Sequence, residues 1–139
     1  MSEQKAARSL HNLGTALKRL REALQEPGEN PLAVDGTIQR FEFVIELYWK
    51  VLKRLLALEG IETYTPRESL QRAYQAHWLA DETAWLQMLR DRNETSHVYD
   101  EETARRIYDH IKEYYPEMER TYCFLLQRFE SQTDRSSLK

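Results

Sequence analysis

Leucine residues in the first part of the chain recur at intervals of three and four. The repeat comprises Leu10, Leu13, Leu17, Leu20 and Leu24. Residues at these intervals lie on one face of an α-helix, so the pattern predicts an amphipathic helix from about residue 3 to residue 25. The segment 27–31 contains two prolines and a glycine, and we expect it to end this helix.

A second helix is predicted from about residue 34 to residue 58, and its apolar surface is wide. The main seam consists of Val34, Ile38, Phe41, Ile45, Tyr48, Leu52 and Leu55, and it is widened by Val44, Leu47, Val51 and Leu58. A helix that is apolar over this much of its circumference is usually central in a fold or shared with a second subunit. Gly60 is a good residue to end the helix, because glycine readily adopts the left-handed conformation that follows many helix C-termini.

The third helix has a strong start signal. Thr65 can cap it, Pro66 suits the first helical position, and Glu68 completes a capping box. Apolar residues at helical spacing follow as far as Trp78. The pattern therefore predicts a short amphipathic helix in this segment.

A fourth helix can be capped by Asp81, and we expect it to end near Arg92 and Asn93. The residues from Glu94 to Tyr99 then form a short connector in this interpretation. Asp100, which follows the connector, is a suitable cap for a fifth helix.

The fifth helix is predicted to be long and to contain a proline. Its apolar face comprises Ala104, Ile107, Ile111, Tyr114, Met118, Tyr122, Leu125 and Phe129. Pro116 removes one helical hydrogen bond, so we expect a kink there, and we expect the polar tail 131–139 to fray. Short connections between helices favour antiparallel neighbours. The chain is therefore predicted to form one all-α domain, residues 1–139, an up-and-down antiparallel bundle of about five helices.

Composition narrows the function classes. The net charge is −3, which disfavours non-specific binding to duplex nucleic acid as the main activity. One cysteine, Cys123, cannot form an intramolecular disulfide, and the first ten residues contain no apolar signal segment, so we expect a cytoplasmic protein. No apolar run is long enough to span a bilayer.

The spacing of the four histidines matches no metal-site motif, and no phosphate-binding loop is found, so no metal or cofactor is expected.

The segment from Arg92 to Tyr99 is the candidate for chemistry. Arg92 and His97 are separated by four residues, and the pairs 72/77 and 105/110 have the same spacing. Two residues five apart within one helix point about 140° away from each other. The pairs 72/77 and 105/110 each lie within one predicted helix, so their side chains are expected to point apart. Arg92 and His97 instead lie on either side of a predicted turn, where their side chains can converge.

An arginine and a histidine placed in this way can cleave RNA. His97 precedes the positive end of the fifth helix, which attracts phosphate and favours the neutral imidazole that can act as a general base. Arg92 can bind phosphate oxygens through two donors, and Asn93 adds a neutral donor. Together they could activate an RNA 2′-hydroxyl and stabilise the charged transition state.

Structural explanations exist for the same residues. Arg92 and Asn93 can close a helix, and His97 can bind backbone carbonyls of the turn. Glu46 and Lys50 lie four residues apart on the second helix. They form either a local ion pair, which we favour, or part of a cleft that includes Arg92.

Three segments together resemble the HEPN superfamily. They are residues 35–42, residues 46–50, and Arg92-Asn93 with His97-Val98-Tyr99-Asp100. The resemblance covers about residues 8 to 129 and is strongest to the HEPN partners of minimal nucleotidyltransferases, which are also called nucleotidyltransferase substrate-binding proteins.

The resemblance implies a function that spacing and composition do not show. Such proteins are helical bundles that form homodimers, with both Arg-x4-His motifs facing a shared cleft. Many are metal-independent endoribonuclease toxins of toxin–antitoxin pairs, and a partner nucleotidyltransferase silences them by adding AMP to the motif tyrosine. Carried over to this chain, Arg92 and His97 would be catalytic, Asn93 supporting, and Tyr99 the site of modification.

Two alternatives to an RNA-cleaving toxin remain open. The chain could be a non-catalytic subunit that presents substrate to a nucleotidyltransferase, which fits the acidic balance and the wide apolar second helix. It could also be a helical adaptor without a site, in which case substitutions of Arg92 and His97 would affect only stability.

Overall fold

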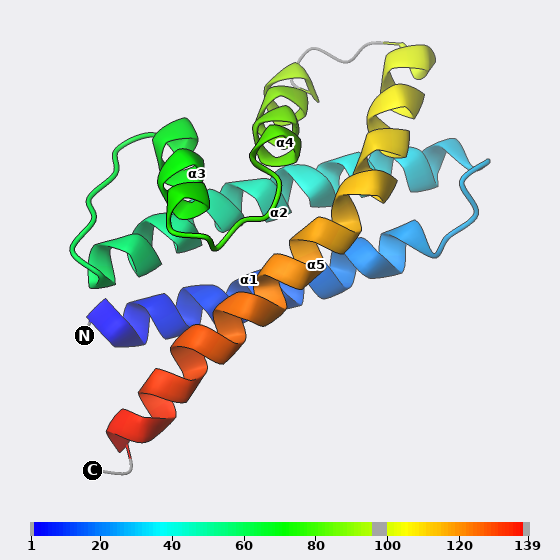
Figure 1. Cartoon of the computed structure of the whole chain (residues 1–139). Helices are drawn as coiled ribbons and strands as arrows, with labels where there is room; N and C mark the ends of the chain where they lie inside the picture. The colour runs from blue at the N-terminus through cyan, green and yellow to red at the C-terminus, as the bar shows by residue number, and fades with distance from the viewer. Residues whose placement is uncertain (1, 96–99, 138–139) are drawn as a thin grey trace.

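The computed structural model describes the backbone of residues 2–95 and 100–137 and the side chains of residues 3–95 and 100–129. These residues form five helices and no strand (Figure 1). The helices are α1 (Ser2–Leu24), α2 (Pro31–Leu58), α3 (Pro66–Gln75), α4 (Glu82–Thr95) and α5 (Glu101–Ser137). The prediction of an all-α bundle is therefore confirmed.

Helix α2 is the centre of the arrangement. Helices α1 and α2 run antiparallel and side by side, α3 and α4 lie against α2 on the side away from α1, and α5 runs obliquely across the bundle (Figure 1). Contacts join α2 to each of the other four helices. The wide apolar surface read from the sequence of α2 is explained by these four neighbours.

One hydrophobic cluster connects all five helices. Helix α2 supplies the largest share of it, through Val34, Ile38, Phe41, Val44, Ile45, Tyr48, Val51, Leu52, Leu55 and Leu56. Aromatic rings bind the layers together, since the Tyr48 and Trp85 rings meet edge to face with centroids 4.6 Å apart. The Tyr48 hydroxyl donates to the carbonyl of Met118 (2.6 Å), and burial is the main reason that the pKa of this tyrosine is raised well above 10.0.

The two ends of α2 follow capping rules. The Asn30 side chain accepts a hydrogen bond from the Leu32 amide (2.9 Å), and Pro31 occupies the first turn. The helix therefore begins at residue 31, earlier than the residue 34 predicted, because Pro31 starts the helix instead of ending the preceding loop. At the other end Gly60 has φ 82° and closes the helix, as predicted.

Helix α3 ends before the point that its apolar pattern suggested. Thr65 caps its start through the Glu68 amide (3.1 Å) as predicted, but the helix ends at Gln75. His77 has φ 67°, and its amide donates to the carbonyl of Tyr74 (2.9 Å), a turn of the Schellman type. Arg72 and His77 are therefore not in one helix, and the prediction that they point apart along a common helix was wrong.

Helix α4 is capped by Asp81, which accepts from the Ala84 amide (3.1 Å). It continues to Thr95, so Glu94 and Thr95 belong to the helix and not to the connector that we predicted. The Thr95 hydroxyl donates to the carbonyl of Arg92 (2.6 Å) and thereby closes the last turn. Arg92 lies within this last turn instead of ending the helix.

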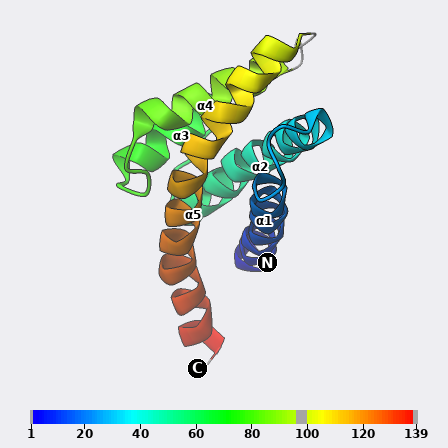
Figure 2. The same ribbon diagram turned by 90° about the vertical axis from the view of Figure 1, so that its right-hand side faces the viewer.

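Helix α5 begins as predicted. Asp100 accepts from the Thr103 amide (2.7 Å), and this hydrogen bond is the main reason that the pKa of Asp100 is lowered. The helix passes through Pro116, and Figure 2 shows its axis changing direction between its yellow beginning and its orange and red remainder. Its backbone is helical as far as Ser137, through the segment that we expected to fray. Across the described residues, no helix is both long and apolar enough to cross a membrane.

A glycine lies at a close approach between α1 and α5. A Cβ atom added to Gly14 would lie 2.2 Å from the hydroxyl oxygen of Tyr122. Gly36, in the first half of α2, differs, since an added Cβ would meet nothing within 4 Å. The first glycine leaves room for the Tyr122 side chain, and the second meets no such neighbour among the described residues.

Candidate functional site

The predicted site lies where α4 ends and α5 begins. Arg92 and Asn93 belong to the last turn of α4, where Arg92 is partly buried and Asn93 is exposed. His97 and Tyr99 lie outside the described residues. The convergence of Arg92 with His97 therefore stays a prediction.

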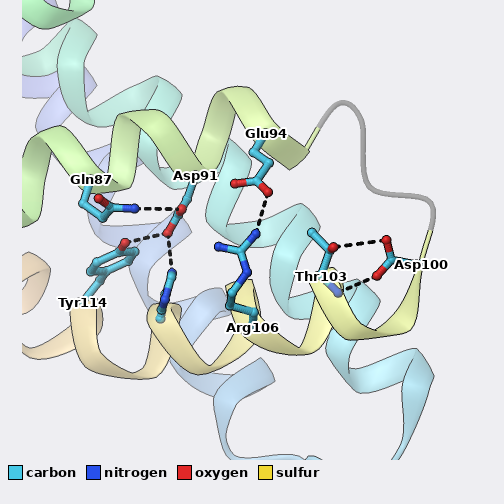
Figure 3. A network of polar contacts seen from close by, with 8 residues as sticks. Gln87, Asp91, Glu94, Asp100, Thr103, Arg106 and Tyr114 are labelled. Atoms are coloured by element: carbon cyan, nitrogen blue, oxygen red, sulfur yellow. Dashed lines mark hydrogen bonds and ion pairs between the residues drawn. The ribbon is translucent and has the colours of Figure 1, made fainter.

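A buried carboxylate directly precedes Arg92. Asp91 has no exposed surface, and three side chains bind it. Its Oδ1 atom accepts from Gln87 Nε2 (3.3 Å), and its Oδ2 atom accepts from the Tyr114 hydroxyl (2.5 Å) and from His110 Nδ1 (2.9 Å). Figure 3 shows Gln87 and Tyr114 pointing toward this carboxylate from α4 and α5.

These contacts satisfy a group that is otherwise costly to bury. A carboxylate can only accept hydrogen bonds, so His110 must carry its proton on Nδ1 to make this contact. Burial, and then the hydrogen bond to Asp91, raise the pKa of Tyr114 far above its ordinary value of 10.0, which keeps the hydroxyl protonated as a donor. The network therefore fixes the donor arrangement around Asp91.

A second polar contact lies one turn further along α4. Glu94 and Arg106 form an ion pair at 2.5 Å, visible in Figure 3. Both side chains are substantially exposed, at 39% and 47%, so this pair contributes little to stability. Gln87, Asp91 and Glu94 follow helical spacing, and Asp91 and Glu94 contact side chains of α5.

Arg92 emerges from the helix about 100° around the axis from Asp91. Its Nε atom is buried and has no hydrogen-bond partner among the described residues. A buried guanidinium nitrogen without an acceptor is unfavourable, and such groups in a native structure call for an explanation.

Glu46 and Lys50 form the local ion pair that we favoured. The distance from Lys50 Nζ to Glu46 Oε1 is 3.6 Å, and both side chains are about half exposed, at 51% and 41%. Lys50 Nζ also lies 5.9 Å from the centre of the Trp49 ring. A cleft shared by this pair and Arg92 stays a prediction.

Sequence reasoning missed Asp91, His110 and Tyr114 as a group. We placed Tyr114 on the apolar face of the fifth helix, where it is indeed buried, and treated His110 only as half of a chance Arg-x4-His match. Asp91 was a recognisable signal, because it lies three residues after the buried Met88, where the apolar face of α4 should continue. A charged residue at a core position requires partners, and His110 and Tyr114 are four apart on one helix face.

The described residues contain no group of three or more His, Cys, Asp or Glu side chains that could hold a metal ion. Among the described residues, the polar groups at this junction include the bound carboxylate of Asp91, the Glu94–Arg106 ion pair, the partly buried guanidinium of Arg92 and the capped start of α5.

Comparison with known proteins identifies relatives of the whole bundle. Residues 8–127 match the family described as nucleotidyltransferase substrate binding protein like. A Haemophilus influenzae protein named probable ribonuclease HepT is 36% identical over 86 residues, which cover 58% of this chain and 59% of that protein. This match therefore spans less than two-thirds of the length of the relative.

Solved structures share the fold. A crystal structure of a Thermus thermophilus protein is 32% identical with a TM-score of 0.75, and the match covers 84% of this chain and 98% of that chain. A Haemophilus influenzae structure is 27% identical with a TM-score of 0.64, covering 92% of this chain and 98% of that chain. It is described as revealing the fold of a substrate binding domain of a nucleotidyltransferase.

These relatives confirm the resemblance inferred from residues 35–42, 46–50 and 92–100. One is named a probable ribonuclease, and another is described as a substrate binding domain of a nucleotidyltransferase. The family match extends over most of the 139 residues and includes α4, the start of α5 and the junction between them. The chain belongs to the nucleotidyltransferase substrate binding protein like family.

Proposed function

We propose that this protein is a metal-independent endoribonuclease toxin of a toxin–antitoxin pair. Arg92 and His97 are its catalytic residues, Asn93 supports them, and a partner nucleotidyltransferase neutralises the toxin by adding AMP to Tyr99. The observation that carries the proposal is Arg92, a partly buried guanidinium at the junction of α4 and α5 whose Nε finds no acceptor within the described chain. A guanidinium that is partly exposed at this junction can bind RNA phosphate oxygens through its terminal nitrogens.

The proposed reaction is an internal transfer at phosphorus. His97 takes the proton of a 2′-hydroxyl, the 2′-oxygen forms a bond to the adjacent phosphorus, and the bond from phosphorus to the 5′-oxygen breaks. The products are a 2′,3′-cyclic phosphate and a 5′-hydroxyl, which receives a proton. Arg92 stabilises the negative charge that develops on the phosphoryl oxygens, and no step requires a metal.

The dimer belongs to the same proposal. Two copies of the chain would place two Arg-x4-His motifs at one cleft. Helix α2 carries an exposed apolar side chain, Phe43 (60% exposed), beside the partly buried Leu47. Light scattering after size-exclusion chromatography measures the mass, and a mass of one chain at micromolar concentration would contradict the shared cleft.

Expression in a bacterial host tests RNA cleavage. Wild type is expected to stop growth and to degrade RNA, whereas His97→Ala and Arg92→Ala are expected to do neither. Arg72→Ala is the matched control, because Arg72 has the same spacing to a histidine but lies at the far end of α3. Equal growth and intact RNA in all four strains would contradict the proposal.

A second candidate is a non-catalytic subunit that binds substrate for a nucleotidyltransferase. The family description and the description of the Haemophilus influenzae structure both favour it. Mass spectrometry of Tyr99 after co-expression with the partner nucleotidyltransferase distinguishes the two candidates. AMP on Tyr99 supports the toxin, and an unmodified tyrosine in a stable complex that leaves RNA intact supports the binding subunit.

A further inference from the structure

We infer that Asp91 is a positioning residue for Arg92, acting through its hydrogen bonds to His110 and Tyr114. The inference deepens the proposed function and rests on it for the claim that Arg92 acts on RNA. The role of Asp91 in fixing the Arg92 side chain can be measured separately.

Besides the more exposed Glu94–Arg106 pair, two carboxylates with little exposed surface attach α4 to α5, one at each end of α4. At the start, Glu117 of α5 accepts from Trp85 Nε1 (3.0 Å) and from the Ala80 amide (3.3 Å). At the end, Asp91 of α4 accepts from His110 and Tyr114 of α5. Glu117 lies far from the predicted site, and Asp91 immediately precedes Arg92, so the two attachments form a natural pair for comparison.

Stability alone does not explain a carboxylate at position 91. Trp85 and Met88, on the preceding turns of the same helix, are buried and provide ordinary apolar packing. A buried charged network is often no more stabilising than apolar side chains of the same volume. Hydrogen bonds do impose one direction and one distance on the groups they join, which apolar contact does not.

The fixed position of Asp91 is transmitted to Arg92 by the helix itself. Consecutive Cα atoms are joined by a rigid peptide unit, and the hydrogen bond from Thr95 to the Arg92 carbonyl closes the turn. Anchoring Asp91 to α5 therefore sets where Arg92 leaves α4 and in which direction. The buried Nε atom of Arg92 indicates that the base of its guanidinium is enclosed as well. Misplacement of a catalytic group by about 1 Å can reduce a rate by about a hundredfold.

A double-mutant cycle on RNA cleavage separates positioning from support of the fold. Asp91→Asn is expected to lower kcat by about tenfold in the wild-type background, with a smaller change in KM. In an Arg92→Lys background the same substitution should have little further effect, since the group that it positions is absent. Glu117→Gln is the matched control and should change cleavage equally, and only slightly, in both backgrounds.

Nuclear magnetic resonance of the arginine Nε–H groups provides a measurement that does not depend on cleavage. The Arg92 signal is identified by its absence in Arg92→Lys. In wild type its exchange with water is expected to be slow, because the Nε atom is buried. Asp91→Asn is expected to accelerate this exchange by about tenfold or more, and Glu117→Gln to leave it unchanged. If Asp91→Asn destabilises the fold too far, Tyr114→Phe and His110→Gln each remove one contact and should show smaller changes in the same direction.

The outcomes distinguish the two proposals. Faster Arg92 exchange in Asp91→Asn without RNA cleavage by wild type would support the positioning role and contradict the ribonuclease. If wild type cleaves RNA and Asp91→Asn has equal effects in both Arg92 backgrounds, the positioning role is overturned. Unchanged exchange of the Arg92 Nε–H with water in Asp91→Asn would also overturn it. Equal changes in Arg92 exchange for Asp91→Asn and Glu117→Gln would also overturn it.

Discussion

The contact of α1 with α2 and the contact of α4 with α5 differ in the side chains that they bury. Among the described side chains of α1, residues 3–24, the buried ones are all apolar, namely Ala6, Leu10, Leu13, Ala16, Leu17, Leu20 and Ala23. The α4–α5 contact contains the Asp91 network and the Glu94–Arg106 ion pair (Figure 3). The first contact excludes water over a long seam, and the second holds two helix segments in one relative orientation next to the predicted site.

This difference separates stability from geometry. Apolar contacts gain free energy in proportion to the area they bury and tolerate small shifts. Hydrogen-bonded networks contribute less net free energy but depend steeply on distance and angle. The part of the bundle adjacent to Arg92 is therefore the part whose contacts specify direction, and variants should affect the two regions in different ways.

The largest loss of stability is expected in the apolar contact. Leu20 has no exposed surface and lies on the buried face of α1. Leu20→Ala removes buried apolar volume and leaves a cavity, so we expect it to lower the free energy of unfolding by about 3 kcal/mol. Urea denaturation followed by circular dichroism measures the change. A loss below about 1 kcal/mol would show that the α1–α2 seam can collapse around the vacancy.

A smaller loss is expected from Asp91→Ala, of about 2 kcal/mol, because His110 and Tyr114 would lose their acceptor. Replacing the network by apolar residues sharpens the test. The triple variant Asp91→Leu, His110→Leu and Tyr114→Phe is expected to recover most of that stability. It should not recover RNA cleavage. Recovery of both stability and RNA cleavage would remove the distinction between the α1–α2 contact and the α4–α5 contact.

Two glycines test how closely the helices approach. Gly36→Ala is expected to raise stability by up to about 1 kcal/mol, because alanine favours the helix and its Cβ meets nothing. Gly14→Ala is expected to lower stability by about 1 kcal/mol, because its Cβ would collide with Tyr122. Thermal unfolding of both variants provides the comparison. Equal gains would show that the Tyr122 ring moves aside without cost.

The smallest effect concerns Glu117 in acid. Burial raises the pKa of this carboxyl, but hydrogen bonds from Arg120, Trp85 and the Ala80 amide outweigh burial, so its pKa in the fold is lowered from 4.5. Its contribution to stability is therefore complete above pH 4.5 and is lost as the pH falls through the lower folded value. Glu117→Gln should flatten the fall in unfolding temperature below that pH. If the unfolding temperatures of wild type and Glu117→Gln fall in parallel as the pH is lowered, the lowered pKa of Glu117 is contradicted.

Sequence reasoning predicted most of the fold because helix faces and caps are local signals. Thr65, Asp81 and Asp100 cap helices as predicted, and Gly60 ends one. The errors lay at boundaries that depend on competing local geometries. Pro31 starts a helix instead of breaking one, and a histidine adopts the left-handed conformation after α3.

The site was harder to predict, because its contacts join residues far apart in the chain. The motif around Arg92 could be recognised from its position between two predicted helices and from the family resemblance. The partnership of Asp91 with Tyr114 spans 23 positions, and it exists only because α4 and α5 pack against each other. Periodicity places each of these residues on a buried face but does not pair them.

The central position of α2 has a consequence for how this protein unfolds. Since α2 contacts all four other helices, no helix can detach without uncovering apolar surface on it. Partial melting is therefore disfavoured, and the bundle should lose its structure in a single all-or-none transition. Tryptophan emission from the α3–α4 side, where Trp78 and Trp85 are buried, and far-ultraviolet dichroism of all five helices should then follow one curve.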